Sequence, residues 1–221
     1  MAVLALAQQG GVVSGSKRIR ILAAADHALL RQGIAALIGL EADMEMVAEA
    51  STGREAVEKF KAHRPDITLM DLQMPEMSGI EAILAIRSEF PKACIIVLTT
   101  YGGDVQVMRA LKAGARGYIL KGRVHKELLE TIRAVHAGQK RLPPEVAAVL
   151  AEHAGEEELS ARELNVLRLI AAGNANKEIA AQLSVTEETV KSHVTSILSK
   201  LGANDRTHAV TIALKRGIIE I

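Results

Sequence analysis

Short apolar runs alternate with amphipathic stretches over the first two thirds of the chain. The runs at residues 67–70 and 95–98 are almost continuously apolar, as expected for parallel strands that are buried on both faces. Between the runs, apolar residues recur at helical spacing, as at Leu30, Ile34 and Leu37. Five strands are predicted here: Ile19–Ala24, Met44–Ala50, Asp66–Met70, Cys94–Thr99 and Gly117–Leu120. Because a helical pattern follows each of them, the simplest architecture is α/β, a doubly wound sheet of five parallel strands.

The last third of the chain carries only helical patterns. Ser160 and Glu163 form a capping box at the start of the first helix, which ends at Gly173-Asn174. Thr186 ends a tight turn and is the expected N-cap of the third helix. The later helices are predicted at Lys177–Leu183, Glu187–Leu201 and about Arg206–Lys215. Two helices joined by a short turn are typical of a helix-turn-helix unit, so a small all-α domain is expected here.

Four segments follow from these patterns. Residues 1–17 are a flexible lead-in, residues 18–137 the α/β domain, residues 138–158 a linker and residues 159–221 the helix-turn-helix domain. The linker contains Pro143-Pro144, a short helical stretch at Val146–His153 and the acidic run Glu156–Glu158. We interpret the acidic run as solvated.

Composition favours a globular, cytoplasmic protein. Of the 221 residues, 49% are hydrophobic and only 2% aromatic, so the cores must be built from aliphatic side chains and methionine. The single cysteine, Cys94, excludes internal disulfides and is expected to be a buried, inert thiol. No apolar run approaches the length of a membrane span, and the apolar start at Met1–Ala7 lacks the basic residues of a signal peptide.

Net charge gives no sign of a strongly basic domain. The formal charge of the whole chain is +1, and from residue 159 onward there are 8 Lys and Arg against 6 Asp and Glu. Any affinity for DNA must therefore come from the local placement of cations and from dimerisation.

Chemically active residues stand at four predicted strand ends. Asp26 follows the first strand, Asp71 the third, Thr99 ends the fourth and Lys121 follows the fifth. In a doubly wound sheet these ends lie on one edge. Two carboxylates suit Mg²⁺, and a carboxylate can accept a phosphoryl group when a metal and an amine neutralise its oxygens. Taken singly, each has a simpler explanation: Asp26 a helix cap, Thr99 an ordinary strand residue and Lys121 a surface lysine.

Residues 19–137 resemble the receiver domain of bacterial response regulators, which has a flavodoxin-like fold. The resemblance lies in Asp26-His27, in Met70-Asp71-Leu72-Gln73-Met74-Pro75, in Leu98-Thr99-Thr100 and in Gly114-Ala115-Arg116-Gly117-Tyr118-Ile119-Leu120-Lys121. It implies that Asp71 is the phosphoacceptor, that Lys121 contacts the phosphoryl group, and that Thr99 and then Tyr118 move inward as a switch. It also implies that Asp26, Asp71 and the backbone carbonyl of Gln73 bind Mg²⁺.

One position departs from the receiver pattern. Receivers normally carry two adjacent acids after the first strand, and here the first of them is Ala25. The resemblance makes Asp26 the direct ligand and assigns the missing acid a role through water. Losing it removes a negative charge and an outer hydrogen-bond acceptor, so we expect weaker Mg²⁺ binding and slower phosphorylation.

The helix at Glu187–Leu201 is expected to lie in a DNA groove. Its apolar residues would pack inward and leave mainly Lys, Ser and Thr outside, of which Lys191 could reach a guanine edge. Arg206 is a further candidate for phosphate contact. The expected DNA-binding residues are Lys177, Thr189, Lys191, Ser192, Thr195 and Lys200. Periodicity alone is equally compatible with a helical domain whose outer face is merely solvated.

Residues 159–219 closely resemble the LuxR-type helix-turn-helix domain. The matching strings are Leu159-Ser160-Ala161-Arg162-Glu163, Asn176-Lys177-Glu178-Ile179-Ala180, Thr189-Val190-Lys191-Ser192-His193 and Lys200-Leu201-Gly202. A receiver followed by this domain is the arrangement of the NarL/FixJ family. The resemblance implies a non-enzymatic transcription regulator with a sensor histidine kinase and promoter DNA as partners, dimeric when active through a last helix around Thr207–Leu214.

Three hypotheses remain at this point. In the first, phosphorylation of Asp71 releases a recognition or dimer surface that the receiver and linker cover. In the second, Ala25 marks a degenerate receiver, and DNA binding needs no phosphate. In the third, Asp71 is the nucleophile of a small phosphotransfer enzyme, although the chain lacks a substrate-binding insertion.

Overall fold

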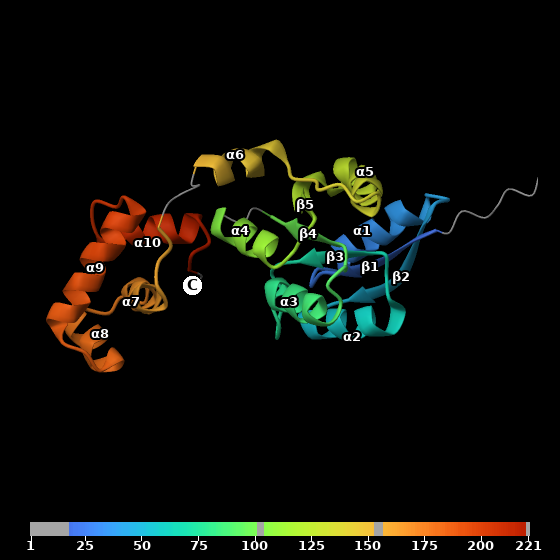
Figure 1. Ribbon diagram of the computed structural model, residues 1–221. Helices are drawn as coiled ribbons and strands as arrows, with labels where there is room; N and C mark the ends of the chain where they lie inside the picture. The colour runs from blue at the N-terminus through green and yellow to red at the C-terminus, as the bar shows by residue number, and fades with distance from the viewer. Residues whose placement is uncertain (1–17, 101–103, 153–156, 220–221) are drawn as a thin grey trace, which may run out of the picture.

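A computed structural model describes residues 18–100, 104–152 and 157–219 of the chain. It contains a five-stranded parallel sheet in the order β2-β1-β3-β4-β5 (Figure 1). The strands are β1 (Ile19–Ala24), β2 (Met44–Ala50), β3 (Ile67–Asp71), β4 (Ile95–Thr99) and β5 (Gly117–Leu120). The expected doubly wound α/β architecture is confirmed.

Two strands begin one residue later than expected. Asp66 stands outside β3 because its carboxylate accepts a hydrogen bond from the Arg20 amide at 2.9 Å. β3 also ends one residue later than expected, since it includes Asp71 as its last residue. Asp71 is therefore held by the sheet itself, with Leu98 as its partner on β4.

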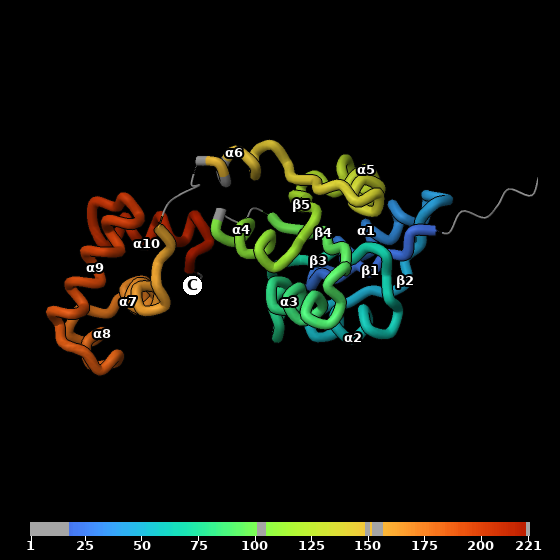
Figure 2. Tube along the Cα trace, in the orientation of Figure 1, coloured from blue at the N-terminus to red at the C-terminus, as the bar shows by residue number. Residues whose placement is uncertain are grey.

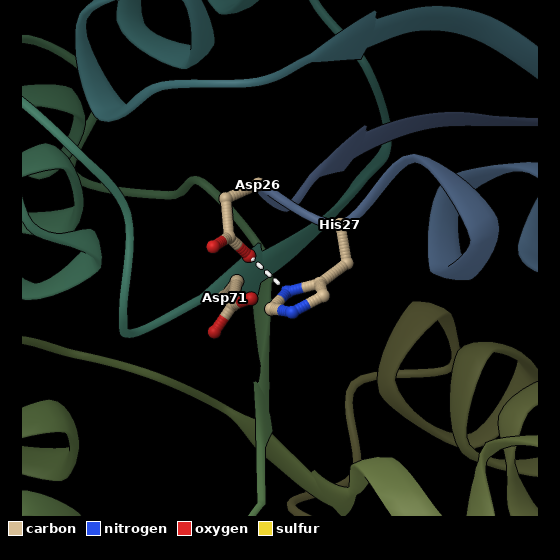
Figure 3. Close-up of side chains that lie close together, drawn as sticks. All are labelled: Asp26, His27 and Asp71. Carbon is tan, nitrogen blue, oxygen red and sulfur yellow. Dashed lines mark hydrogen bonds and ion pairs between the residues drawn. The ribbon is translucent and has the colours of Figure 1, made fainter.

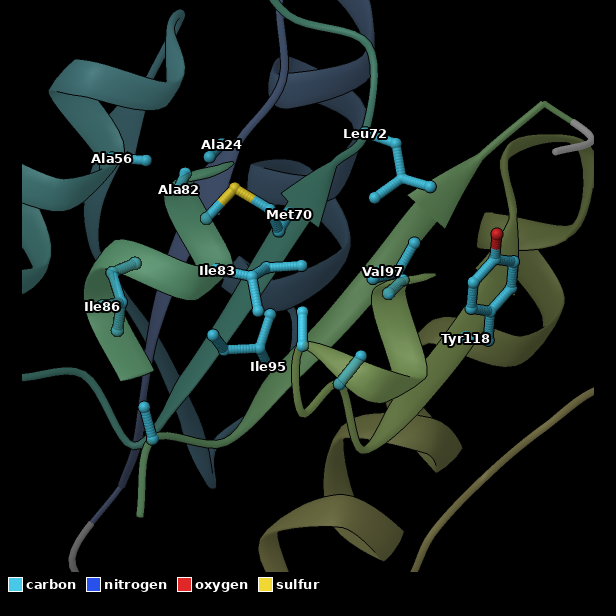
Figure 4. Close-up of a cluster of buried hydrophobic side chains, with 14 of the residues drawn as sticks. Ala24, Ala56, Met70, Leu72, Ala82, Ile83, Ile86, Ile95, Val97 and Tyr118 are labelled. Atoms are coloured by element: carbon cyan, nitrogen blue, oxygen red, sulfur yellow. The ribbon is translucent and has the colours of Figure 1, made fainter. Parts of the chain in front are cut away.

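Helices cover both faces of the sheet. The helices are α1 (Ala28–Gly39), α2 (Gly53–His63), α3 (Gly79–Glu89), α4 (Asp104–Lys112) and α5 (Val124–His136). On one face, α1 and α5 pack on the strands through residues such as Ile34 and Ile132. On the other face, α2, α3 and α4 enclose a cluster that includes Met70, Val97 and Tyr118 (Figure 4). Both faces are buried, which explains why the strands read as continuous apolar runs.

The linker is part of the α/β layer. The Tyr118 amide donates to the Arg141 carbonyl at 2.9 Å, and the Arg141 amide donates to the Arg116 carbonyl at 3.0 Å. Helix α6 (Pro144–Glu152) follows and places Val146, 5% exposed, in the cluster around Tyr118. Figure 2 shows this segment running from β5 across α4. The helix begins two residues before the expected Val146, and His153 and the lead-in lie outside the described residues.

Four helices make up the C-terminal part. They are α7 (Ala161–Ala171), α8 (Asn176–Leu183), α9 (Glu187–Leu201) and α10 (Arg206–Lys215), close to the expected ranges. The capping box of Ser160 and Glu163 and the Thr186 cap are both present. Ser184, in the left-handed conformation at φ 54°, makes the sharp turn between α8 and α9. No helix in the described part of the chain has the length and hydropathy of a transmembrane span.

The C-terminal helices meet the receiver-like part at α4. Val105 of α4 packs against their core, and Gly217 and Ile218, just after α10, lie in the same contact region as Gln106. Lys112 forms an ion pair with Glu158 at 2.5 Å, so this end of the acidic run is paired as well as solvated. Figure 1 shows these helices on the α4 side of the sheet, away from β2.

Candidate functional site

The carboxyl edge of the sheet gathers the expected residues. Asp71 ends β3, Thr99 ends β4, Asp26 follows β1 by two residues, and Lys121 directly follows β5. The strands β1, β3, β4 and β5 are consecutive neighbours, so these four residues share one edge. The Lys121 ammonium lies 2.6 Å from Asp71 Oδ2, although the two residues are fifty positions apart.

Asp71 is the most buried carboxylate of the site, with a side chain that is 1% exposed. Its Oδ1 accepts a hydrogen bond from the Gln73 amide at 3.1 Å. Its Oδ2 has Lys121 as an ion-pair partner but no well-aligned hydrogen-bond donor among the described residues. Burial raises the pKa of Asp71, and the negative charge of Asp26 adds to the effect, while Lys121 and the Gln73 amide oppose it. A further cation would therefore stabilise its ionised form.

Asp26 is not the helix cap that its position allowed. The N-cap of α1 is His27, whose side chain makes no capping hydrogen bond. Instead, His27 Nδ1 lies 2.5 Å from Asp26 Oδ1 (Figure 3). Partial burial acts to raise the pKa of Asp26, but the His27 hydrogen bond and the charges of His27 and Lys121 outweigh it, so the pKa is lowered.

His27 belongs to the site, and the sequence did not point to it as a metal ligand. One ligand atom each from Asp26, His27 and Asp71 lies within 4.8 Å of the others. In Figure 3 the imidazole and both carboxylates turn toward a common space. The available signal was its place: N-caps are usually Ser, Thr, Asp or Asn, and a histidine there has its ring free for another contact.

Ala25 occupies the position of the missing acid and is fully buried. Its carbonyl accepts a hydrogen bond from Arg31 Nη1 at 2.5 Å, and the same guanidinium group lies 3.6 Å from Glu49. Arg31 thus fixes the loop that follows β1. The site retains two carboxylates, and the nearest additional donor is the imidazole of His27.

Gly79, the first residue of α3, lies against the backbone of Asp71. Its amide donates to the Leu72 carbonyl at 2.9 Å, and an added Cβ would lie 2.0 Å from the Asp71 carbonyl oxygen. Only glycine allows α3 to start this close to the end of β3. This contact could not be predicted from the sequence, because it joins residues on two different elements.

Thr99 and Tyr118, the expected switch pair, are both buried, at 4% and 2% exposure. Burial raises the pKa of the Tyr118 hydroxyl, and the Thr99 hydroxyl offsets only part of the effect. We expected Tyr118 to move inward after phosphorylation. The structure already has it inward, because Val146 of the linker helix and Val107 of α4 belong to the cluster that surrounds it.

Helix α9 carries most of the expected DNA-binding residues on its outside. Lys191, Ser192 and Thr195 are exposed, and so is Lys177 on α8. Thr189 is half-buried, and its hydroxyl lies 2.8 Å from the Thr186 hydroxyl at the helix start. These side chains are not covered in the described conformation. The hypothesis that the receiver and linker cover a recognition or dimer surface stays a prediction.

Lys200 and Ser196 have partners inside the helical part. Lys200 Nζ lies 3.0 Å from Glu163 Oε2, and the Ser196 hydroxyl donates to Glu163 Oε1 at 2.6 Å. Burial would raise the pKa of Glu163, but Ser196, the Ser160 backbone and Lys200 lower it to about 2. Ser196, expected outside, is thus half-buried, and contact of Lys200 with DNA would compete with this ion pair.

Comparisons with known proteins agree with both halves. The family model for the response regulator receiver domain matches residues 21–133, and that for bacterial regulatory proteins of the luxR family matches residues 157–213. The chain belongs to the NarL/FixJ family of response regulators. It is a two-component response regulator that controls transcription.

The relatives of this response regulator match it over almost its full length. The transcriptional regulatory protein YhcZ of Bacillus subtilis is 43% identical, over 89% of this chain and 96% of its own. The response regulator VraR of Staphylococcus aureus is 38% identical, over 91% of this chain and 99% of its own.

Solved structures of response regulators match the chain over both parts. RcsB of Salmonella enterica, bound to the promoter P1flhDC with the phosphomimetic BeF3-, is 26% identical with a TM-score of 0.71, covering 92% of this chain and all of that one. The haem-sensing-system regulator ChrA is 34% identical with a TM-score of 0.54, covering 91% of this chain and 99% of its own.

Proposed function

We propose that a sensor histidine kinase phosphorylates Asp71 and that the phosphoryl group controls DNA binding by this regulator. The observation that carries the proposal is the pair of Asp71 and Lys121, a buried carboxylate 2.6 Å from the ammonium of a lysine side chain that is 14% exposed, at the carboxyl edge of the sheet. Such a pair provides a nucleophile together with a positive charge for the oxygens of the incoming phosphoryl group.

In the proposed transfer, Asp71 is the nucleophile and the imidazole of the kinase histidine is the leaving group. An oxygen of Asp71 forms a bond to phosphorus, and the bond between phosphorus and the kinase imidazole nitrogen breaks. The electron pair stays on the imidazole, which takes up a proton from solvent. Lys121 neutralises charge on the phosphoryl oxygens, and the Thr99 hydroxyl, at the end of the neighbouring strand, is available to bond one of them.

The residues at this edge fit Mg²⁺. Carboxylate oxygens of Asp26 and Asp71 converge within the range of a shared cation, and oxygen ligands are those that Mg²⁺ prefers. We propose that these two side chains hold the ion together with the Gln73 carbonyl. Bound Mg²⁺ would neutralise the two carboxylates and the phosphoryl oxygens.

We further propose a division into a receiver at residues 18–137, a linker at 138–158 and a DNA-binding domain at 159–221. Exposure of Lys191, Ser192, Thr195 and Lys177 supports contact with double-stranded promoter DNA, with Thr189 at the start of the same face. The phosphorylated protein would act as a homodimer, so that two α9 helices read two half-sites. RcsB has been solved as two dimers bound to DNA.

The test is the intact mass of the protein after incubation with acetyl phosphate and Mg²⁺, beside Asp71→Asn. We expect one phosphoryl adduct on the wild type and none on the variant. DNA affinity is then measured by fluorescence anisotropy on both, and phosphate should raise it only for the wild type. An adduct that persists on Asp71→Asn would refute the assignment.

A second candidate is a regulator that binds DNA without phosphorylation. The buried Ala25 favours it, because the receiver lacks one of its usual acids. The inward Tyr118 also favours it, because the switch is already in the position that phosphate would induce. The same experiment decides: absence of any adduct, with high DNA affinity in both proteins, would support this candidate.

A further inference from the structure

We infer that His27 is a third side-chain ligand of the cation at the carboxyl edge, and that this site prefers a divalent transition metal ion to Mg²⁺. The inference rests on the proposed cation site at Asp26 and Asp71. It adds to that site a nitrogen donor and a different choice of ion.

Geometry places the imidazole where a ligand is needed. His27 Nδ1 lies 2.5 Å from Asp26 Oδ1, and the ligand atoms of His27, Asp26 and Asp71 are within 4.8 Å of one another. The His27 side chain is 70% exposed, so a small rotation can open room for an ion between the two groups. The His27 side chain makes no capping hydrogen bond to an amide of α1.

Burial of Asp71 provides an independent reason for a third ligand. Its side chain is 1% exposed, and its Oδ2 has no well-aligned hydrogen-bond donor among the described residues. Lys121 is the one cation paired with it in the described part of the chain. A metal ion held by His27 and Asp26 would place a second positive charge beside this carboxylate, in addition to Lys121.

The replacement of an acid by Ala25 changes which ion the site should take. An acid there would add negative charge and an oxygen acceptor, which favour a hard cation such as Mg²⁺. A neutral imidazole adds no charge but provides a nitrogen, which binds transition ions more strongly than Mg²⁺. With Ala25 buried and His27 at the site, the selectivity should therefore move toward the transition ions.

Another arrangement would give the same contact without metal ligation. His27 could donate its Nδ1–H to Asp26 and only orient that carboxylate. The two arrangements differ in whether the nitrogen touches the metal. That difference can be measured directly with Mn²⁺, whose unpaired electrons couple to a coordinated ¹⁴N nucleus.

The experiment uses the full chain without an affinity tag and Mn²⁺ as the probe. Free Mn²⁺ is counted by electron paramagnetic resonance during titration, Mg²⁺ is added as competitor, and ¹⁴N coupling is recorded on the bound ion. The variants are His27→Ala, Ala25→Asp, Asp71→Asn and the control His63→Ala, an exposed histidine at the end of α2.

We expect Mn²⁺ to bind the wild type with a ¹⁴N coupling that His27→Ala abolishes, with affinity reduced about tenfold or more. His63→Ala should change neither, and Ala25→Asp should raise the affinity for Mg²⁺. Mn²⁺ binding that depends on Asp71 but shows no ¹⁴N coupling would overturn the inference and leave the cation site intact. If the wild type binds neither Mn²⁺ nor Mg²⁺, or binds them no more tightly than Asp71→Asn does, both the inference about His27 and the proposed cation site are overturned.

Discussion

At the scale of single residues, the carboxyl edge depends on neighbours that are distant in sequence. Asp71 forms an ion pair with Lys121, and its backbone lies so close to Gly79 that a side chain at position 79 would overlap it. In the helical part, Glu163 also bonds residues that are distant in sequence, since it joins the start of α7 to Ser196 and Lys200 of α9. Both are acids buried among specific partners, so removing a partner should cost more than removing a surface charge.

Gly79→Ala should damage the phosphorylation site. The new Cβ would overlap the Asp71 carbonyl, so we expect a loss of about 1–3 kcal/mol in the free energy of unfolding and slower adduct formation with acetyl phosphate. Gly33→Ala is the control, because a Cβ there meets nothing within 4 Å and should stabilise α1 by about 0.5–1 kcal/mol. Urea unfolding followed by circular dichroism measures both, and equal effects would contradict the assignment.

Glu163 should make the stability of the helical part depend on pH. Its pKa is about 2 in the fold against an ordinary value of 4.5, so its carboxylate stabilises the folded state fully above about pH 4.5. This contribution is lost as the pH falls from 4.5 toward 2. Glu163→Gln should lower the free energy of local unfolding of α9 by about 2 kcal/mol at neutral pH and by much less at pH 3.

Hydrogen exchange of α9 peptides, corrected for the intrinsic rate at each pH, reports this difference. The control is Glu187→Gln, an exposed acid in the first turn of α9, which should not reproduce it. A Glu163→Gln deficit of the same size at both pH values would mean that the carboxylate acts through packing instead of charge.

At the scale of elements, α1 and the linker decide which receiver surface is available. Leu29 and Leu40 are 84% and 82% exposed, and Gly33 and Ala36 are exposed between them at helical spacing. We call these four residues the α1 stripe. At the β5 edge of the sheet, the chain's own Arg141 and α6 occupy the surface. We therefore expect a second receiver to pack on the α1 stripe.

Leu29→Glu and Leu40→Glu should each weaken dimerisation of the phosphorylated protein about tenfold, because each places a charge in the contact between two α1 stripes. Leu84→Glu is the control, since Leu84 is 53% exposed on α3, away from the stripe. Sedimentation velocity over a concentration series gives the dissociation constants. A large effect of Leu84→Glu alone would move the interface to the α3 face.

At the scale of the whole molecule, described residues of the two halves meet around α4, while side chains of the recognition helix stay exposed. Val105 of α4 packs on the helical core, while Lys191 and Thr195 of α9 remain exposed. With these side chains exposed, we expect control through dimerisation, because pairing two receivers raises the effective concentration of the second DNA-binding domain.

Val105→Asp should separate the two halves. A charge at this apolar contact costs about 1–2 kcal/mol, which raises the fraction of separated molecules about tenfold. Small-angle X-ray scattering should then give a larger radius of gyration, while Met108→Asp, at an exposed position of the same helix, should not. Because α9 is already open, DNA affinity of the unphosphorylated protein should change little. A large gain in affinity would instead show that the contact is inhibitory.

The sequence by itself determined the elements and the candidate residues at the carboxyl edge of the sheet. The strands could be read because parallel strands buried on both faces are continuously apolar, and the helices because capping residues such as Ser160 and Thr186 act locally. The placement of Asp26, Asp71, Thr99 and Lys121 at strand ends followed from the same pattern, since carboxyl ends of parallel strands share one edge.

Only the tertiary structure decided the contacts between elements. Four contacts depend on packing or on the choice of rotamer. They are the inclusion of His27 in the site, the close approach of Gly79 to Asp71, the inward position of Tyr118 beside α6, and the ion pair of Lys200 with Glu163. Periodicity states which face a residue occupies, but not which neighbour it meets there. These side-chain contacts depend on how the helices pack against the sheet and against one another.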